Sequence, residues 1–386
     1  MVWKAIGWKG EVAEESIEGP TDSQFKAHFE ELLKPLMEQV NNAIDFDESP
    51  YIPVLDDPFT IEELNCVGRE LKTNKSYIGI CPMLFSILPP QWMLFFLAIF
   101  NWIFCFSSYP FTWCHNKLIT LFKSGAKLQC GNYRGISIMN TLSKVYDLLI
   151  TKRLSVWFSI DKCQAGAQKG RGCVEQILSL RLLIDYAKFK EKLYVLFVDY
   201  SKAYDRVPRA KLLEYLKTLG CGRRMLLAIQ GMYRCTKNIL KSAIVESSIG
   251  VRQGAPSSCL LFVIYIDKMV KMLKERIGND GYLGAIHALL LMDDTVLVAT
   301  SREMCTRKLE ILLDFCSEYG MSVNVKKTKF FVINGSEIDR HPLRVRGSTV
   351  DYCSKYCYLG AWFTADGDMK SVLKIHKMLM YQQGVF

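Results

Sequence analysis

The stretch Leu289-Leu290-Leu291-Met292-Asp293-Asp294-Thr295-Val296-Leu297-Val298 decides how this chain folds. It consists of two short apolar runs with a pair of carboxylates between them, which is the pattern of a buried β-hairpin. Its tip has neither the Asn-Gly nor the Asp-Gly pair that a tight turn prefers. Adjacent acids repel each other at such a tip, and a bound divalent cation would remove that repulsion. A solvated turn without a ligand is the alternative interpretation.

A third carboxylate, Asp199, ends another apolar run, Leu193-Tyr194-Val195-Leu196-Phe197-Val198. If this strand lies beside the hairpin, Asp199, Asp293 and Asp294 meet at one edge of a sheet. Three carboxylates in that position suit two Mg²⁺ ions that clamp the attacking and leaving oxygens of a phosphoryl transfer. The sequence therefore predicts a metal site made of these three residues.

The composition is that of a globular protein, with 386 residues of which 50% are hydrophobic and 23% charged. The formal net charge of +10 permits a polyanionic partner, although a basic surface is also an ordinary solubility feature. The 14 cysteines are scattered singly and predict neither a disulfide framework nor a zinc site. With no secretion signal in view, we expect reduced thiols and a cytoplasmic or nuclear location. Nothing in the composition indicates an oligomeric state.

One apolar segment, Trp92 to Phe106, is a candidate for membrane insertion. It is shorter than the roughly 20 residues that cross a bilayer. We therefore predict a buried core helix, with Asn101 inside it, and no transmembrane helix.

Periodicity and capping signals predict an α+β protein. Thr21 and Thr60 are expected to cap helices, the second with Glu63 in a capping box. The acidic, Pro-containing stretch 45–58 suits a loop. Further helices are predicted at 92–106, 141–154, 174–190, 209–219, 257–274 and 302–319, with a short one at the C-terminal end. Strands are predicted at 118–122, 193–198 and 323–332, with a hairpin arm at 356–363.

Basic side chains occupy both arms of a predicted hairpin, Lys123 on the first and Arg134 on the second. Such a pair can grip a triphosphate, Arg by its bidentate fork and Lys as a point charge. Ordinary exposed charge is the alternative.

Two Gly-rich loops follow. The loop 164–172 is basic and can follow a phosphate backbone through its amides and cations. In the loop 249–256, two glycines bracket Gln253 and let the backbone approach a flat substrate closely, which a tight turn without a ligand would also require. Tyr204, five residues beyond Asp199, suits the floor of a sugar pocket or ordinary packing.

In series these stretches resemble the reverse transcriptases of non-LTR (LINE-type) retrotransposons. The matching elements stand in the family's order, roughly from residue 59 to 377. They are Phe122-Lys123-Ser124-Gly125 with Asn132-Tyr133-Arg134-Gly135, Gln164-Ala165-Gly166, Phe197-Val198-Asp199 with Ala203-Tyr204-Asp205, Gly250-Val251-Arg252-Gln253-Gly254, Met292-Asp293-Asp294, Gly320 with Lys327-Thr328-Lys329, and Tyr358-Leu359-Gly360.

The resemblance implies a right-hand polymerase of fingers and palm, with an antiparallel palm sheet packed on helices. It divides the chain into an N-terminal helical lead-in and linker (1–58), a fingers-like region (59–190), a palm (191–340), and a palm end with primer grip and the truncated start of a thumb (341–386). It implies RNA-directed DNA synthesis, with an RNA template, a DNA primer and deoxynucleoside triphosphates as partners. Two Mg²⁺ ions, for which Mn²⁺ is a substitute, would be the cofactors.

Residue roles follow from the same resemblance. Asp199, Asp293 and Asp294 would hold the metals, Asp293 more directly than Asp294. Lys123 and Arg134 would hold the triphosphate, and Tyr204 would exclude a ribose 2′-OH. Gln253 and Gly254 would line the nascent base pair. Lys327 would protonate the leaving pyrophosphate.

The chain departs from the family pattern at several positions, among them Leu291, Met292 and Ala255, but none of these removes a metal ligand. Because no endonuclease precedes the polymerase region and most of a thumb is missing, we expect an intact active site with low processivity. A noncatalytic nucleic-acid-binding remnant is the alternative. A group II intron maturase or a telomerase-like protein would need further RNA-binding domains.

Overall fold

Strand β3 (Leu193–Val198) is the centre of the fold because both of its faces are buried. Its even-numbered residues face one hydrophobic core and its odd-numbered residues face a second one. A strand covered on both faces needs an apolar side chain at every position, which explains its uninterrupted run of Leu, Tyr, Val and Phe.

The computed structural model describes residues 19–34, 44–71, 78–241 and 243–367. Around β3 it forms a six-stranded sheet in the order β6-β7-β3-β8-β10-β9, antiparallel except between β8 and β10. The other strands of this sheet are β6 (Ala288–Leu291), β7 (Asp294–Ala299), β8 (Lys329–Ile333), β9 (Leu343–Val345) and β10 (Ser348–Tyr352).

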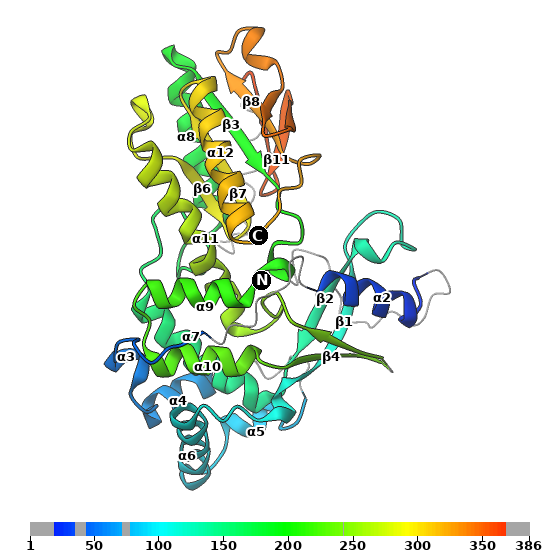
Figure 1. Cartoon of the computed structure of the whole chain (residues 1–386), viewed down its shortest axis with the longest axis vertical. Coiled ribbons are helices and arrows are strands. Elements are labelled where there is room, and N and C mark those ends of the chain that lie inside the picture. Colours follow the sequence, from blue (N-terminus) through cyan, green and yellow to red (C-terminus); the bar gives the residue numbers. More distant parts are fainter. Residues whose placement is uncertain (1–18, 35–43, 72–77, 242, 368–386) are drawn as a thin grey trace, which may run out of the picture.

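Helices cover both faces of this sheet (Figure 1). Helix α8 (Cys173–Lys190) and the hairpin of β11 (Lys355–Tyr358) and β12 (Ala361–Thr364) supply the second core. Helices α11 (Pro256–Ile277) and α12 (Arg302–Glu318) pack on the opposite face. The central strands of the sheet are therefore buried on both faces, whereas its edge strands β9 and β10 keep exposed side chains.

A second sheet, in the order β2-β1-β4-β5, projects from the side of the molecule and carries helix α2 (Asp22–Leu32) on one face (Figure 1). Its strands are β1 (His115–Phe122), β2 (Tyr133–Ile138), β4 (Thr236–Leu240) and β5 (Ala243–Ser247). A helical base lies below the six-stranded sheet and beside the second one (Figure 1). It is built from α3 (Pro53–Asp56), α4 (Ile61–Glu70), α5 (Pro82–Ser86), α6 (Pro90–Phe106), α7 (Thr141–Trp157), α9 (Arg209–Thr218) and α10 (Arg223–Tyr233).

The capping predictions are confirmed. Thr21 and Thr60 both cap their helices, and Thr60 forms a reciprocal capping box with Glu63. The α+β class and the predicted long helices are also confirmed. Three boundaries were wrong: the strand expected at 323–332 begins only at Lys329, the stretch 356–363 lies within a complete hairpin, and the loop 45–58 contains the short helix α3.

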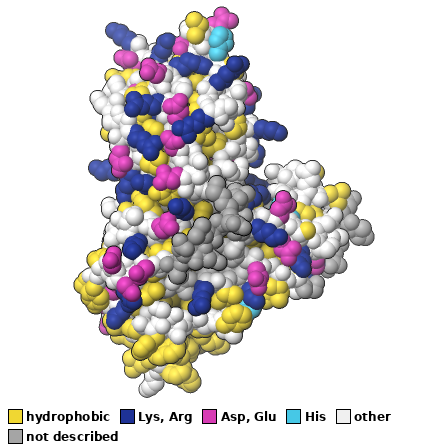
Figure 2. All heavy atoms as spheres, in the orientation of Figure 1, with side chains coloured by type: hydrophobic (Ala, Val, Ile, Leu, Met, Phe, Trp, Pro, Cys, Tyr) yellow, Lys and Arg dark blue, Asp and Glu magenta, His cyan; other side chains and the backbone are white. Residues whose placement is uncertain are grey.

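Helix α6 is only half buried, so the prediction of a core helix needs correction. Phe100 and Phe104 are fully buried. The polar side chain of Asn101 is tolerated in this helix because it forms two hydrogen bonds with the backbone of Phe59, one as acceptor and one as donor. The opposite face leaves Trp92 and Trp102 more than half exposed. Figure 2 shows hydrophobic side chains gathered at this end of the molecule. Across the described residues, no helix combines the length and apolarity needed to cross a membrane.

The domain boundaries inferred from the sequence stay a prediction. The opening of the chain before residue 19, Leu36, residues 75–77 and the expected C-terminal helix and thumb start at 368–386 lie outside the described residues.

Candidate active site

Asp199, Asp293 and Asp294 meet at one edge of the six-stranded sheet. Strands β3 and β7 are antiparallel with Val198 opposite Thr295, so the next position sets Asp199 opposite Asp294. Strands β6 and β7 pair as far as Leu291 and Asp294, which leaves Met292 and Asp293 as a two-residue turn. The prediction that the two apolar runs lie side by side is confirmed.

The turn that carries Asp293 is held in place by Gln164, a residue that sequence reasoning did not place in the site. Met292 has a positive φ of 58°. Its N–H donates to Gln164 Oε1 (2.9 Å), and its carbonyl accepts from Gln164 Nε2 (3.3 Å). The amide of this one buried side chain therefore satisfies both backbone groups of a strained residue.

The Gly-rich composition of the loop 164–172 suggested that its amides follow a phosphate backbone. At the start of the loop this prediction was wrong, because the amides there bind groups of the protein itself. The N–H of Ala165 donates to Leu290 O (2.8 Å), and that of Gly166 donates to Gln164 Oε1 (2.7 Å). A Cβ at Gly166 would lie only 2.6 Å from Met292 Sδ, so the glycine allows the loop to pack against the turn. Lys169, further along, keeps an exposed side chain.

Electrostatics link the three carboxylates. Desolvation, followed by repulsion from Asp293 and Asp199, raises the pKa of Asp294 to about 6, although its side chain is exposed. The pKa of Asp293 is also raised, chiefly by desolvation, with Asp199 adding to the effect. Like charges held this close are the arrangement that a cation would stabilise.

The donor set fits a hard divalent cation, because all three side chains offer carboxylate oxygens. Within residues 19–34, 44–71, 78–241 and 243–367, however, no three His, Cys, Asp or Glu side chains form a group that could hold a metal ion. The backbone beneath the carboxylates is fixed, because Asp199 N donates to Thr328 Oγ1 (3.2 Å) and Asp199 O accepts from Asn324 N (2.7 Å).

A cationic hairpin faces the carboxylates. Strands β1 and β2 pair with Leu121 opposite Arg134, and Lys123 N donates to Asn132 O (2.9 Å), so Lys123 and Arg134 stand on opposite arms as predicted. Both side chains are exposed, and their charges partly offset the raised pKa values of Asp293 and Asp294.

Two more lysines complete this positive region. Burial lowers the pKa of Lys202, and the charges of Lys123, Arg134 and Lys327 lower it further. Lys327 lies in the turn before β8 with an exposed side chain, so its charge faces the same space. Lys202 was not predicted as a site residue, although its position three residues after Asp199 was a usable signal.

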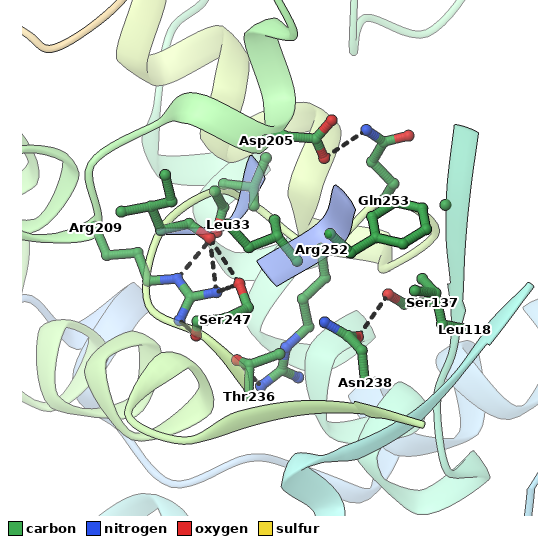
Figure 3. Close-up of a pocket in the computed structure, with 15 residues that line it drawn as sticks. Leu33, Leu118, Ser137, Asp205, Arg209, Thr236, Asn238, Ser247, Arg252 and Gln253 are labelled. Atoms are coloured by element: carbon green, nitrogen blue, oxygen red, sulfur yellow. Dashed lines mark hydrogen bonds between the residues drawn. The ribbon is translucent and has the colours of Figure 1, made fainter. Parts of the chain in front are cut away.

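Tyr204 and the loop 250–254 form the side of the site nearest the second sheet. The Tyr204 ring is half buried and stacks on Phe262 with centroids 4.5 Å apart. Gln253 Nε2 donates to Asp205 Oδ1 (2.7 Å), a contact drawn in Figure 3. Gly254 has a φ of 109° and packs on Ser137 of β2.

The β11–β12 hairpin borders the carboxylates on the other side. The Tyr356 ring stacks on Phe197 of β3, with centroids 4.1 Å apart and an interplanar angle of 9°. Desolvation, with added repulsion from Asp199 and Asp294, raises the pKa of Tyr356 to about 12. This hairpin contains the Tyr358-Leu359-Gly360 stretch on which the primer-grip resemblance rests.

The comparisons with known proteins agree with this geometry. Residues 122–363 match the family model described as reverse transcriptase (RNA-dependent DNA polymerase). The chain belongs to the reverse transcriptase family. Its relatives assign it to the non-LTR branch of that family, as the sequence motifs predicted.

Three relatives illustrate the match. The Pol polyprotein of the type-1 retrotransposable element R2 from Nasonia vitripennis is 26% identical over 297 residues, covering 72% of this chain and 29% of that protein. The type-2 element R2DM polyprotein from Drosophila melanogaster is 24% identical, with coverage of 81% and 31%. The RNA-directed DNA polymerase of mobile element jockey from Drosophila funebris is 23% identical, with coverage of 79% and 35%. The reverse transcriptase chain thus spans about a third of the length of these curated relatives.

Among solved structures, a telomerase from Candida tropicalis in complex with a TWJ fragment of telomeric RNA aligns with a TM-score of 0.47 and 14% identity. That alignment covers 67% of this chain and 45% of the telomerase chain.

Proposed function

We propose that this reverse transcriptase chain is an RNA-directed DNA polymerase of a non-LTR retrotransposon, which adds deoxynucleotides to a primer 3′-OH by two-metal phosphoryl transfer. The observation that carries the proposal is the meeting of Asp199 with the Asp293-Asp294 turn at one sheet edge, opposite the cationic pair Lys123 and Arg134. An RNA template, a DNA primer and deoxynucleoside triphosphates would be its partners. Those partners would place its work in the cytoplasm or the nucleus.

Two Mg²⁺ ions, or Mn²⁺ as a substitute, would be held by Asp199, Asp293 and Asp294. When bound, such ions stabilise charge on the attacking and leaving oxygens of the transferred phosphate. The carboxylates supply oxygen ligands of the kind that Mg²⁺ prefers, and their mutual repulsion favours cation binding.

Other residues would handle the nucleotide. Lys123 and Arg134 are exposed and face the carboxylates, so they can hold the triphosphate by charge-assisted hydrogen bonds. Tyr204 would block a ribose 2′-OH, and Gln253 with Gly254 would line the nascent base pair. Lys327 would hold a proton for the leaving pyrophosphate, because its exposed ammonium lies in the same positive region.

Primer extension on an RNA template, with Mg²⁺ and with EDTA, tests this function. We expect metal-dependent incorporation that Asp199→Asn reduces at least about a hundredfold, since a metal clamp supplies several kcal/mol of transition-state stabilisation. Asp314→Asn is the matched control, because Asp314 lies on α12 and pairs with Arg276 at 2.9 Å, outside the site. Incorporation that survives EDTA or Asp199→Asn would contradict the proposal.

A noncatalytic nucleic-acid-binding remnant is the second candidate, favoured by the departures from the family pattern at Leu291, Met292 and Ala255. Filter binding across a salt series separates the two functions. Salt-sensitive binding of primer–template without any incorporation would support the remnant.

A further inference from the structure

The segment that carries Tyr204 and the loop that carries Gln253 are tied together by three hydrogen bonds. Two connect the backbones: Val251 N donates to Tyr204 O (2.9 Å), and Gly250 N donates to Val207 O (2.8 Å). The third is the side-chain contact from Gln253 Nε2 to Asp205 Oδ1 (2.7 Å). We call this set of contacts the clasp.

Close backbone approach makes the clasp tight. Gly250 has a φ of 79°, and a Cβ there would lie 2.7 Å from Asp205 O. Arg209 fixes the loop from behind, because its buried guanidinium donates to Gly250 O (3.0 Å) and Ile249 O (3.1 Å). Figure 3 shows Arg209 beside Ser247, with which it also shares a hydrogen bond. On the far side the loop is bound to β2, since Ser137 N donates to Gln253 O (2.8 Å).

A small cavity lies beside the clasp. It has a volume of about 30 Å³ and is lined by Ser137, Asp205, Arg209 and Gln253 among others (Figure 3). Such a space holds a water molecule or two and is far below the roughly 300 Å³ of a ligand pocket. The polar groups around it therefore serve to position the loop, and a nucleotide would bind at the open sheet edge instead.

Asp205 determines which way the Gln253 amide faces. An ionised carboxylate only accepts hydrogen bonds, so the Gln253 NH₂ group must turn toward it. Burial raises the pKa of Asp205, while the hydrogen bond from Gln253 and the charges of Lys202 and Arg134 favour the ionised form and counter part of that rise. With Nε2 held by Asp205, Gln253 presents Oε1 and one remaining N–H to whatever lies in front of the loop.

We propose that Asp205 is a positioning residue for nucleotide sugar selection: it fixes the Gln253 amide and locks the loop to the segment that bears Tyr204. The inference rests on the proposed polymerase function and deepens it. Because Tyr204 O and Asp205 Oδ1 both bind this loop, the tyrosine and the glutamine hold one fixed separation. A sugar pocket with a fixed width is what discrimination against an additional hydroxyl requires.

The test is single-nucleotide incorporation by the full chain, with deoxy- and ribonucleoside triphosphates measured separately. For Asp205→Ala we expect the KM for deoxynucleotide to rise about tenfold while kcat changes less than about threefold, because a charge-assisted hydrogen bond is lost. The preference for deoxynucleotide over ribonucleotide, as a ratio of kcat/KM values, should fall by a similar factor. Asp314→Asn is the control and should leave all these values unchanged.

A paired variant separates positioning from simple stabilisation. In Asp205→Asn combined with Gln253→Glu, the donor and acceptor exchange places, so the tether between the two segments is restored while the substrate-facing amide is lost. Hydrogen exchange at the Gly250 and Val251 amides should return to the wild-type rate in this variant, whereas the deoxynucleotide preference should stay low.

If the wild-type chain is active, two results would overturn this inference and leave the proposed polymerase function intact. One is a wild-type deoxynucleotide preference in Asp205→Ala. The other is a parallel fall of kcat for both nucleotides that follows the folded fraction, which would indicate a merely structural role. A wild-type chain that incorporates neither nucleotide would contradict the proposed function and this inference together.

Discussion

Gln164 shows how one buried amide can hold the turn that carries Asp293. Its side chain binds both the N–H and the carbonyl of Met292, the residue with positive φ next to Asp293. Gln164→Glu replaces the donor by a carboxylate oxygen, which repels the Met292 carbonyl and leaves it unpaired. We expect a loss of about 1–3 kcal/mol in turn stability and a marked fall in primer extension.

The matched control is Gln230→Glu on α10, in the helical base. Primer extension and the midpoint of thermal unfolding should be measured for both variants. If Gln164→Glu extends primers as well as Gln230→Glu does, the turn does not depend on this amide.

Asp147 makes a pH-dependent contribution to stability. It is fully buried on α7, where Oδ1 accepts from Ser257 N (3.1 Å) and Oδ2 has no hydrogen-bond partner among the described residues. Burial raises its pKa to about 6, above the value of about 3.9 in an unfolded chain. Asp147 therefore contributes most stability at low pH, and that contribution is lost as the pH rises through 6.

The difference in unfolding free energy between wild type and Asp147→Asn should accordingly shrink by roughly 1 kcal/mol from pH 5 to pH 7. Denaturant unfolding of both proteins at three pH values in this range measures it. A difference that does not change with pH would show that Asp147 keeps an ordinary pKa.

At this scale the sequence predicted residues whose chemistry is visible in their type, and missed those whose role depends on a distant partner. Acids that directly follow apolar runs form a local pattern, and that pattern predicted that Asp199, Asp293 and Asp294 meet at one sheet edge, which the strand pairing confirms. Gln164 acts on a turn 128 residues away, and no local pattern connects the two positions. The assays above test roles that stay predictions: metal binding by Asp199, Asp293 and Asp294, and the roles of Lys123, Arg134, Tyr204, Gln253, Gly254 and Lys327.

Helix α6 has one buried and one exposed face, and substitutions on the two faces should differ in their effect on stability. Phe100 has no exposed surface and lies 6.1 Å, between ring centroids, from Trp113, whereas Trp102 is 56% exposed two residues later. Phe100→Ala should cost about 3–5 kcal/mol of stability, since it opens a cavity in the core. Trp102→Ala should change stability by less than about 1 kcal/mol.

Urea unfolding of the two variants measures this contrast. Equal losses would mean that the exposed face of α6 is covered in the folded protein. The periodicity of this helix could not predict the outcome, because apolar side chains occupy both of its faces.

The sequence analysis did not predict strands β4 and β5, because polar side chains occupy buried positions in them. Thr236 and Asn238 are buried in β4 although they are polar, because Asn238 pairs with Ser137 (3.2 Å) and Thr236 lies beside the Arg252 guanidinium. A hydrophobic pattern of period two is therefore absent from the sequence. The strand predicted to begin at Val323 begins only at Lys329. The residues before it have the apolar pattern but form a turn, in which Asn324 N donates to Asp199 O.

For the whole molecule, the sequence predicted the family and the order of the parts, since seven short motifs in series constrain the topology strongly. It did not predict how the parts pack, because packing depends on contacts such as the clasp between residues far apart in the chain. Figure 1 shows the consequence, a tall sheet platform above a helical base with the cationic hairpin at the side.

The net charge of +10 is a property of the whole molecule, and it predicts how the proposed binding of nucleic acid would depend on salt. Lysine and arginine side chains are spread over the face seen in Figure 2 rather than gathered in one patch. Binding of an RNA–DNA primer–template should therefore weaken steeply with salt, because each neutralised phosphate releases a counterion. The slope of log affinity against log salt concentration is proportional to the number of phosphates that the protein contacts.

Lys169 is the side chain on which this count can be tested. It is exposed on the loop that packs against the Met292 turn, beside the proposed active site. Lys169→Gln should weaken binding equally for all template sequences and reduce the salt slope by about 0.7–0.9. Lys217→Gln is the control, because Lys217 on α9 donates to Asp45 O (2.6 Å) in the helical base and should not alter the slope. If both variants keep the wild-type slope, the loop 164–172 does not contact phosphate, and the path of the template lies elsewhere on the molecule.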